Sequence, residues 1–501
     1  MAMIARRLGR SVVLLERGTH PRFAIGESST PLSNLLLEEL SAKYHLQEIG
    51  NLTKWGVWQD SHPEIACGLK RGFSFFHHEL RLQKPAIRTR ETELLVAASP
   101  YDRIADTHWY RSDFDWFLVE QAQKLGVEYL DAVELKQCLE DSCGITLRGT
   151  RRGEGMTVRA QFVIDATGPR GFLHRALELG ERELPEMPDT QILYSHFAGV
   201  KPLQDARWND APYPVEDAAV HHVFSGGWIW ILRFNNGVTS AGVVATERLA
   251  NEWGLREGQR AWDRVLLTVP ELRQQFTDAE AVQPFRHIAR PGFRSASIVG
   301  EHWALLPSAA GFVDPLLSTG FTLNLLGIQR LAEVIGHPWD GNEFTSQLKT
   351  YAKYTDEELV ATARLISALF ANMGNFSLFS SLALLYFAAA SYSEAAHRLG
   401  KPELTTGFLL HDHPQFGARS KEVLGRAMRA SQGEESVALI EDVLRAIEPI
   451  DLAGLARRDR CNWYPVDAED ILGSAAKLGV SRREVSQMLE RCGFRPATLQ
   501  T

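Results

Sequence analysis

The sequence predicts an α/β fold in which a parallel-sheet unit is followed by an antiparallel sheet and a mainly helical C-terminal region. Near the N-terminus and again between residues 111 and 165, helical patterns alternate with short β-branched strands, which is typical of βαβ units. From about residue 185 to 300 the pattern alternates and is rich in aromatic residues, which indicates antiparallel strands. Beyond about 340 the helical period dominates. We therefore expect one unit over residues 1–340, with the antiparallel sheet inserted, and a helical region over 341–501.

The composition is that of a globular protein that handles small molecules. At 501 residues, with 45% hydrophobic and 23% charged residues, the chain can bury a large core. Its net charge of −8, without a cluster of Lys and Arg, argues against a nucleic-acid partner. The five cysteines are scattered without a CxxC pair, and the apolar run from Val12 to Leu15 is too brief for a signal peptide. We expect a cytoplasmic location.

The first segment, MAMIARRLGRSVVLLERG, indicates the end of a helix, a turn at Gly9, a β-branched strand and then Glu16. In a dinucleotide-binding fold an acid at this place accepts hydrogen bonds from the adenosine ribose hydroxyls, although a solvated glutamate at a strand end is an equally simple alternative. Such a fold also has an earlier strand and a GxGxxG turn whose amides approach the pyrophosphate. The sequence has neither. We expect that the true start lies upstream or that the chain is a fragment, which the DNA upstream would test.

Later segments continue the unit. RSDFDWFLVEQAQKLGVEYL (Arg111 to Leu130) has an apolar helical face, ends its helix at Gly126 and leads into a strand. In QFVIDATGPRGFLHRAL a buried strand precedes a tight turn from Asp165 to Gly168, where the backbone meets a ligand or another strand. From Leu365 to Ser393 there is no charged residue, which is long enough for a membrane span. Polar residues interrupt this stretch, so we expect two buried helices around a turn and leave a peripheral membrane contact open.

Four separated motifs then carry a family resemblance. They are PRFAIGESSTP (Pro21 to Pro31), CGLKRGFSF (67–75), GGWIWILRF (Gly226 to Phe234) and WALLPSAAGFVDPLLSTGFTLNLLG (Trp303 to Gly327). Over about residues 1 to 340 the chain resembles the p-hydroxybenzoate-hydroxylase-like and geranylgeranyl-reductase-like FAD proteins, and among them the tryptophan-halogenase-like flavin-dependent halogenases. The resemblance implies a Rossmann-like FAD domain of the glutathione-reductase type, here without its first strand and GxGxxG, and an antiparallel substrate sheet. The first motif is similar to the family's segment that passes near the flavin.

The longest motif is similar to the family's second FAD signature and to its Fx.Px.Sx.G loop, with Pro315 and Gly320 in register. The resemblance implies that Pro315, Thr319 and Gly320 adjoin the flavin, and that unpaired N–H groups of Thr319 and Gly320 bind halide, with chloride the implied anion. By itself such a loop before a helix is an ordinary cap. Many relatives have Gly-Asp-Ala where this chain has residues 307–309, so the hydroxyl of Ser308 stands in place of the usual aspartate contact to FAD.

Two motifs imply a wall and a catalytic group. GGWIWILRF matches the family's WxWxIP signature at Trp228 and Trp230, with Leu232 in place of proline. Residues two apart on a strand face the same way, so the indoles form one wall, which the family uses to separate flavin from substrate; two core tryptophans are the alternative. CGLKRGFSF is similar to the KxGxxF segment, which implies that Lys70 is the catalytic lysine. Its amine would hydrogen-bond hypohalous acid or form a chloramine. A solvated surface lysine is the alternative, and Lys54 is the reserve candidate.

The same resemblance implies four further FAD contacts, at Glu16, Arg111, Asp165 and Gly168. One departure bears on the substrate. Tryptophan halogenases place a glutamate directly before the serine of the loop, where this chain has Leu317. A phenol-type, pyrrole-type or carrier-bound substrate therefore fits better than tryptophan.

The resemblance as a whole implies an FAD-dependent oxidoreductase, and first of all a halogenase that uses O2, halide and reduced FAD from a separate flavin reductase on an electron-rich substrate. A flavin monooxygenase or a geranylgeranyl-reductase-like enzyme is the first alternative, and a non-catalytic truncated flavin-domain protein is the second. No metal site is expected, because His411 and His413 have no evident third ligand.

Overall fold

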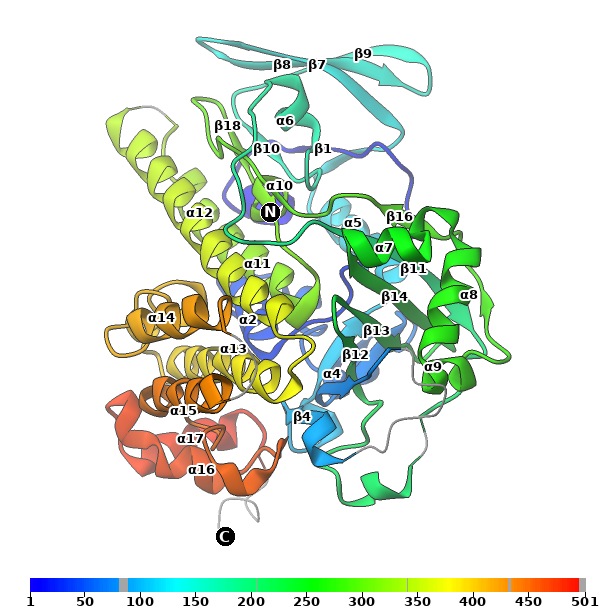
Figure 1. Ribbon diagram of the computed structural model, residues 1–501. Coiled ribbons are helices and arrows are strands. Elements are labelled where there is room, and N and C mark those ends of the chain that lie inside the picture. The colour runs from blue at the N-terminus through cyan, green and yellow to red at the C-terminus, as the bar shows by residue number, and fades with distance from the viewer. Residues whose placement is uncertain (81–88, 204, 340, 431–433, 495–501) are drawn as a thin grey trace.

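The computed structural model describes residues 1–80, 89–203, 205–339, 341–430 and 434–494. In Figure 1 a large sheet lies beside a body of helices, and a small sheet projects above both. The expected α/β class, with an antiparallel sheet and a helical C-terminal region, is confirmed.

The parallel-sheet part consists of two short parallel pairs. β1 (Val13–Leu15) pairs with β6 (Glu128–Leu130), and β10 (Val163–Asp165) pairs with β18 (Trp303–Leu305). The predicted alternation of helix and strand is present, because α1 (Ala2–Arg7) precedes β1 and α5 (Arg111–Lys124) precedes β6. The other α-helices described before residue 340, apart from those beside the large sheet, are α2 (Pro31–Lys43), α3 (Gln47–Gly50), α4 (Trp55–Ser61), α6 (Phe172–Ala176), α10 (Pro307–Ala310) and α11 (Thr319–Gly336).

A three-stranded antiparallel sheet projects from this part at the top of Figure 1. Its strands follow one another in chain order as β7 (Val133–Asp141), β8 (Gly144–Arg151) and β9 (Glu154–Ala160). β7 is mostly exposed along its length.

The predicted antiparallel region between 185 and 300 forms the larger part of a nine-stranded sheet with the order β15-β11-β14-β13-β12-β3-β4-β20, to which β16 adds beside β11. Three strands come from outside that region and were not predicted, and the pairs β12–β3 and β4–β20 are parallel. β3 in particular was missed because it is buried on both faces and shows no alternation of polar and apolar residues. The strands are β3 (Gly72–His77), β4 (Glu93–Ala97), β11 (Thr190–Ala198), β12 (Ala218–Phe224), β13 (Gly227–Arg233), β14 (Val238–Thr246), β15 (Glu280–Ala281), β16 (Arg286–Ile288) and β20 (Trp463–Tyr464).

The two faces of this sheet belong to two different cores. Ile229 and Ile231 of β13 lie in the smaller core, which is shared with α7 (Glu247–Trp253), α8 (Gln259–Thr268) and α9 (Pro270–Gln275). These three helices flank the sheet at the right of Figure 1. Trp228 and Trp230, on the opposite face of the same strand, lie in the main core. The face that carries the two indoles is therefore turned toward the centre of the molecule.

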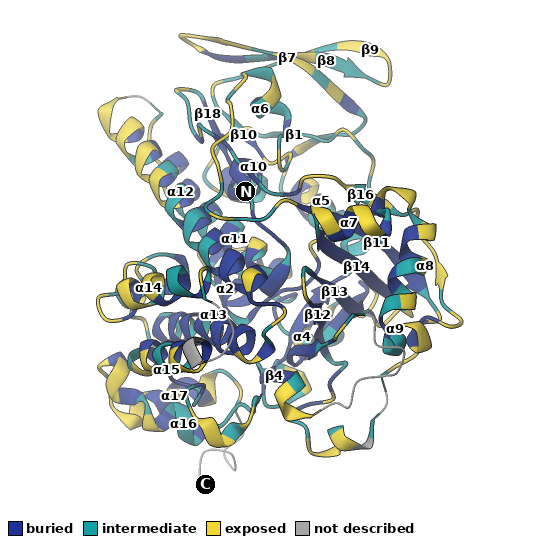
Figure 2. Ribbon diagram, in the orientation of Figure 1, coloured by how far each residue is buried: buried dark blue, intermediate teal, exposed yellow. Residues whose placement is uncertain are grey.

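The helical region includes two long helices, α12 (Asn342–Ala371) and α13 (Phe376–Arg398), with a turn over 372–375. This confirms the two buried helices predicted for the uncharged stretch. α13 is long and apolar enough to cross a membrane, but 83% of its most apolar window is buried in the protein, and it is dark blue in Figure 2. It is a core helix. The remaining helices are α14 (Gly417–Ala427), α15 (Glu434–Ile447), α16 (Ala468–Gly473) and α17 (Arg482–Arg491).

Candidate active site

Lys70 is the last residue of β2 (Cys67–Lys70), and its side chain is completely buried. Its ammonium donates to Ser28 Oγ at 2.8 Å and to the Ser29 carbonyl at 2.5 Å. The same Nζ lies 3.8 Å from the ring centroid of Phe73, where the aromatic face attracts a cation. Lys70 is therefore not the solvated surface lysine that the sequence left open.

Burial brings the charged and neutral forms of the Lys70 amine close to balance near pH 7. Burial lowers the pKa of Lys70 to about 7, against the opposing charge of Asp106. Asp106 lies directly across from Lys70 in the antiparallel pair of β2 and β5 (Asp106–Trp109), and burial raises the pKa of its carboxyl. Burial, with Lys70 as the second cause, lowers the pKa of His108 and of His221 to about 3, so both imidazoles are neutral at pH 7.

Lys54, the reserve candidate, approaches the same carboxylate. Its Nζ lies 3.6 Å from Asp106 Oδ1, and about a fifth of its side chain is exposed. Asn34 donates to the same oxygen at 2.8 Å. Lys54 thus serves as a partial counter-charge for Asp106, while Lys70 is the lysine enclosed among aromatic rings.

Trp228 and Trp230 lie on one face of β13, with ring centroids 5.8 Å apart. The predicted common orientation of the two indoles is confirmed. Trp228 contacts His221 on one side at 5.4 Å between ring centroids. Its Nε1 neighbours the carboxyl of Asp314 and opposes the rise of that carboxyl's pKa. The contact is weak, because neither Nε1 nor Asp314 Oδ2 makes a hydrogen bond of normal geometry to any described residue. Trp228 therefore lies between the imidazole of His221, which neighbours Lys70, and the loop that contains Asp314.

The C-terminal region completes the surroundings of Lys70, which the sequence did not reveal. Phe73 of β3 contacts Tyr386 and Phe387 of α13, with centroid distances of 6.3 and 5.1 Å. Phe75 stacks on His221 at 4.4 Å and contacts Phe379 of α13 at 5.9 Å. One helix of the C-terminal region thus supplies part of an aromatic enclosure around the buried lysine.

The loop that precedes α11 has a strained backbone. Leu317 and Ser318 are left-handed, with φ of 64° and 55°, and Thr319 then begins the helix of 18 residues. Non-glycine residues in this region cost energy and often occur at functional sites. The first amides of a helix have no intrahelical acceptor, and a Cβ added at Gly320 would meet nothing within 4 Å. The helix start and the open space at Gly320 are compatible with the predicted anion site at Thr319 and Gly320, which stays a prediction.

Asp314 is a buried acid in this loop that sequence reasoning missed. Its Oδ1 accepts from the Leu316 amide at 2.9 Å, and it is 3% exposed. Burial raises the pKa of its carboxyl to about 7, while the Leu316 amide and Trp228 oppose the shift. The residue stands beside Pro315 within the recognised motif, but no sequence pattern shows that its carboxyl faces an indole.

Glu16, predicted to hold the adenosine ribose, and Arg111, predicted to contact the flavin side, lie at a strand end and a helix start. Glu16 directly follows β1; its Oε1 accepts from the Gly18 amide at 2.7 Å, and Oε2 lies 3.8 Å from Arg22. Arg111, the first residue of α5, donates to the carbonyls of Ile25 and Gly26 at 2.8 and 3.0 Å. It also forms a bidentate pair with Asp115. Arg111 thereby ties the 21–31 motif to α5.

Comparison with known proteins decides the family. A model of the tryptophan halogenase family matches residues 91–373, which is more than half of the 501 residues. The chain belongs to the tryptophan halogenase family. The family resemblance found in the sequence is thereby confirmed. The expected cofactor is confirmed with it, since the enzymes of this family use FAD together with halide.

Curated relatives match the chain over most of its length. It is 28% identical over 374 residues to the monodechloroaminopyrrolnitrin halogenase PrnC of Pseudomonas fluorescens, which covers 72% of this chain but only 63% of that protein. It is 28% identical over 405 residues to the tetracycline 7-halogenase of Kitasatospora aureofaciens, covering 78% of this chain and 71% of that protein. The crystal structure of halogenase PltM in complex with phloroglucinol and FAD matches with a TM-score of 0.80 at 23% identity, over 92% of this chain and 96% of PltM. At that identity the likeness shows the fold.

The remaining predicted FAD residues of the chain have mixed environments. Both carboxylate oxygens of Asp165 are already engaged, by the Thr167 amide and hydroxyl and by the Leu173 amide at 2.6 to 2.7 Å. Asp165 thus shapes the turn that brings Gly168, with φ of 82°, into open space. Ser308 lies in α10, and its amide donates to Asn324 Oδ1 at 2.9 Å.

These surroundings fit FAD. Three observations support the fit: a Cβ placed at Gly320 or at Gly168 would meet open space within 4 Å, and Asp314 Oδ2 makes no hydrogen bond of normal geometry to a described residue. When FAD binds here, the loop of Pro315, Thr319 and Gly320 would hold its ring, with Arg111 on the same side, and Glu16 and the turn at Gly168 would hold the rest.

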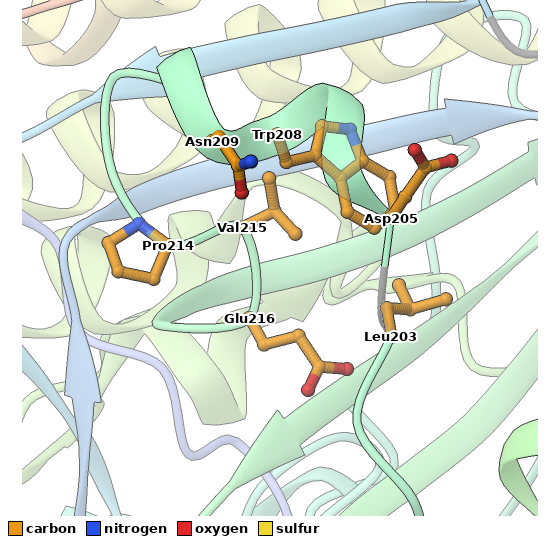
Figure 3. A pocket seen from close by; sticks show the side chains of 7 residues that line it. All are labelled: Leu203, Asp205, Trp208, Asn209, Pro214, Val215 and Glu216. Atoms are coloured by element: carbon orange, nitrogen blue, oxygen red, sulfur yellow. The ribbon is translucent and has the colours of Figure 1, made fainter.

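A surface hollow of about 460 Å³ lies apart from Lys70 (Figure 3). Trp208 and Val215 pack on the smaller core, on the opposite face of the sheet from Trp228. The hollow is therefore not part of the lysine enclosure. It is lined by Leu203, Asp205, Trp208, Asn209, Pro214, Val215 and Glu216.

The structure gives His411 neighbours that the sequence did not show. Ligand atoms of Glu357, His411 and Asp412 lie within 4.8 Å of one another. His413 is not part of this group, since its Nδ1 accepts from the amides of Gln415 and Phe416 at 3.3 Å. Asp412 is exposed, and His411 Nδ1 already pairs with it at 3.2 Å. We assign no metal to the group.

Proposed function

We propose that this chain halogenates a small, electron-rich aromatic compound, with Lys70 as the residue that delivers the halogen. One observation carries the proposal: a completely buried lysine, with a pKa of about 7, ends among aromatic rings behind a tryptophan wall. Burying an amine without a carboxylate in hydrogen-bond contact is costly, so a use for its reactivity explains the position.

Bound reduced FAD would supply the oxidising chemistry, which turns O2 and halide into hypohalous acid. The residues of the chain do the rest. The amides of Thr319 and Gly320, at the positive end of α11, would bind the halide. Trp228 and Trp230 keep organic substrate on the side of Lys70 and away from the ring, so that only the small oxidant passes.

Lys70 would act as a relay for the halogen. Its neutral amine attacks the halogen of hypohalous acid: an N–X bond forms, the O–X bond breaks, and the departing hydroxide takes the amine proton as water. The aromatic carbon of the substrate then takes the halogen from nitrogen, and the amine recovers a proton from the ring carbon. The alternative is an ammonium that hydrogen-bonds and polarises intact hypohalous acid; the two differ in the protonation state that they need.

The enclosure favours a phenol-type substrate. Phe73, Phe75 and Phe387 offer flat apolar faces, and Leu317 leaves the loop without the carboxylate of tryptophan halogenases. Two similar proteins point the same way by name, since one acts on tetracycline and the other was crystallised with phloroglucinol. A carrier-bound acyl substrate is the second arm of the test.

The test uses the full chain with FAD, a flavin reductase, O2 and bromide, offered free phloroglucinol in one arm and a pyrrolyl group on a carrier protein in the other. A brominated product that drops at least about a hundredfold in Lys70→Ala, as expected for loss of a covalent catalyst, supports the proposal. Lys136→Ala is the control, because that lysine is exposed on β7. Oxygenated product that ignores bromide, or full bromination by Lys70→Ala, overturns it.

A further inference from the structure

The segment from Gly26 to Thr30 carries a glutamate whose partners lie more than 150 residues away. Glu27 is 3% exposed. Its Oε1 accepts from His196 Nε2 at 2.7 Å, and its Oε2 accepts from Ser240 Oγ at 2.7 Å. His196 on β11 and Ser240 on β14 are direct partners in the antiparallel register, so one carboxylate closes over two adjacent strands.

The hydrogen bonds continue to the tryptophan wall. Trp230 Nε1 donates to Ser240 Oγ at 3.1 Å, while the Ser240 hydroxyl donates onward to Glu27. The serine thus has both its donor and an acceptor position in use, which fixes its rotamer. The indole of Trp230 is thereby linked to the 26–30 segment through a single hydroxyl.

The other end of the segment holds the lysine. The two residues after Glu27 provide the acceptors of the Lys70 ammonium, Ser28 Oγ and the Ser29 carbonyl. The Glu27 carbonyl itself accepts from the Trp109 amide at 2.5 Å. Because Ser28 and Ser29 directly follow Glu27 in the chain, fixing the side chain of Glu27 also restricts where the two acceptors of Lys70 can lie.

Water is kept from this network by aromatic rings. Phe23, Tyr110 and Phe234 surround His196, with centroid distances of 4.6, 5.6 and 5.9 Å. In such a dry setting each hydrogen bond is strong, and loss of one partner leaves the other costly to bury.

We infer that Glu27 is a positioning residue that, through His196 and Ser240, holds the acceptors of Lys70 and the indole of Trp230 in one fixed arrangement. The inference rests on the proposed function of Lys70 for its catalytic consequence, but its structural content is independent of that function. It assigns to the 26–30 segment the mechanical joint between the lysine and the wall.

The test compares substitutions of different chemistry. Glu27→Leu keeps a side chain of similar bulk and removes both hydrogen bonds. Glu27→Gln can keep both, because its amide oxygen accepts from Ser240 while its amide nitrogen donates to the other tautomer of His196. Ser240→Ala removes the hydroxyl that joins Glu27 to Trp230 and leaves the bond between Glu27 and His196. Ser195→Ala is the matched control: it removes a buried hydroxyl on the same strand as His196 that bonds the Gln283 carbonyl at 2.6 Å.

Amide hydrogen exchange of the 23–34 region gives the readout that needs no activity. We expect exchange at least about tenfold faster in Glu27→Leu and Ser240→Ala, and unchanged in Glu27→Gln and Ser195→Ala. The second readout is the yield of brominated product per reduced flavin consumed, with a soluble trap that records escaped hypobromous acid. Yield is expected to fall about tenfold in Glu27→Leu, with trapped oxidant rising, and to be rescued in Glu27→Gln.

The outcomes separate the inference from the proposed function. Unchanged exchange and yield in folded Glu27→Leu overturn the inference. So does equal loss in Glu27→Gln and Glu27→Leu, since the charge rather than the joint would then matter. If Glu27→Leu does not fold, Ser240→Ala decides by the same two readouts. A wild-type chain that brominates nothing refutes the proposed function, while hydrogen exchange still decides the role of Glu27.

Discussion

The residue scale turns on the protonation of Lys70. Because its pKa is about 7 rather than 10.5, the fraction of neutral amine rises roughly tenfold between pH 6 and pH 8. If the amine is the relay, the halogen-transfer rate in single-turnover experiments should rise by about that factor over the same window and level off above it. The rate of hypohalous acid formation, measured with a trap in Lys70→Ala, corrects for the flavin step. A rate that falls over this window shows instead that the ammonium is the active form.

Asp314 should change the pH dependence of stability in the direction opposite to that of an ordinary ion-paired acid, because its pKa is raised by folding. Its folded pKa of about 7 lies above the ordinary value of 3.8, so the folded state binds a proton that the unfolded state releases. The free energy of unfolding that this residue contributes is complete below about pH 4 and is lost as pH rises to 7, by up to ~1.4 kcal/mol per pH unit. Asp314→Asn should therefore gain stability relative to the wild type between pH 5 and pH 7.5. Urea unfolding at both pH values measures it, and a constant difference contradicts the buried acid.

Which site residues the sequence revealed depends on how far apart their partners lie. Lys70, Trp228 and Trp230 were found because each sits in a short local motif. Glu27 and Asp106 were not, because their roles come from contacts with residues distant in the chain: Ser240 for the first and Lys70 for the second. A glutamate in a loop and an aspartate at a strand end have no local pattern that predicts burial. The roles assigned to the predicted FAD and halide residues stay predictions.

At the element scale, the start of α11 joins a strained turn to an open helix end. Gly320→Ala should not destabilise the protein, because the new methyl meets nothing within 4 Å and alanine favours a helix by up to about 1 kcal/mol. The same methyl would fill the space beside the Thr319 and Gly320 amides. We therefore expect the KM for halide to rise about tenfold or more while the melting temperature stays equal or increases.

Gly473→Ala is the matched control for that experiment. It ends α16, its Cβ would also meet nothing within 4 Å, and it lies in the C-terminal helices. Kinetics with varied bromide and a thermal melt of both variants suffice. A Gly320→Ala enzyme with the wild-type KM for bromide places the halide elsewhere.

Element prediction from sequence succeeded where one pattern was unmixed. The turn at 372–375 between α12 and α13 was predicted from the polar residues that interrupt an apolar stretch. β3 was not, since it is almost wholly buried and pairs in parallel with β12, a partner far along the chain. Continuous apolar runs of this length fit a strand or a helix equally, and only the pairing partner decides.

At the scale of the whole molecule, the regions on the two sides of the predicted boundary at residue 340 share one hydrophobic core. The main core draws residues from Ile4 to Leu489, and both sides of residue 340 contribute to it. The aromatic rings of β3 contact α13 directly, through Phe73 with Phe387 and Phe75 with Phe379. The two regions therefore depend on each other for burial, even though their secondary structure differs as the sequence indicated.

This dependence predicts that residues 1–340 cannot fold alone. Removing 341–501 would expose the apolar faces of Phe73, Phe75 and their neighbours, and each large side chain that loses its burial costs about 1.5–3 kcal/mol. A few such losses equal the whole stability of an ordinary domain, about 5–15 kcal/mol. We expect the 1–340 fragment to show no cooperative unfolding by urea or heat and to bind an apolar dye, whereas the full chain unfolds cooperatively. A fragment with a sharp transition and protected amides in β3 would establish the boundary at 340 as a true domain border, and Lys70 would then owe its burial to the sheet alone.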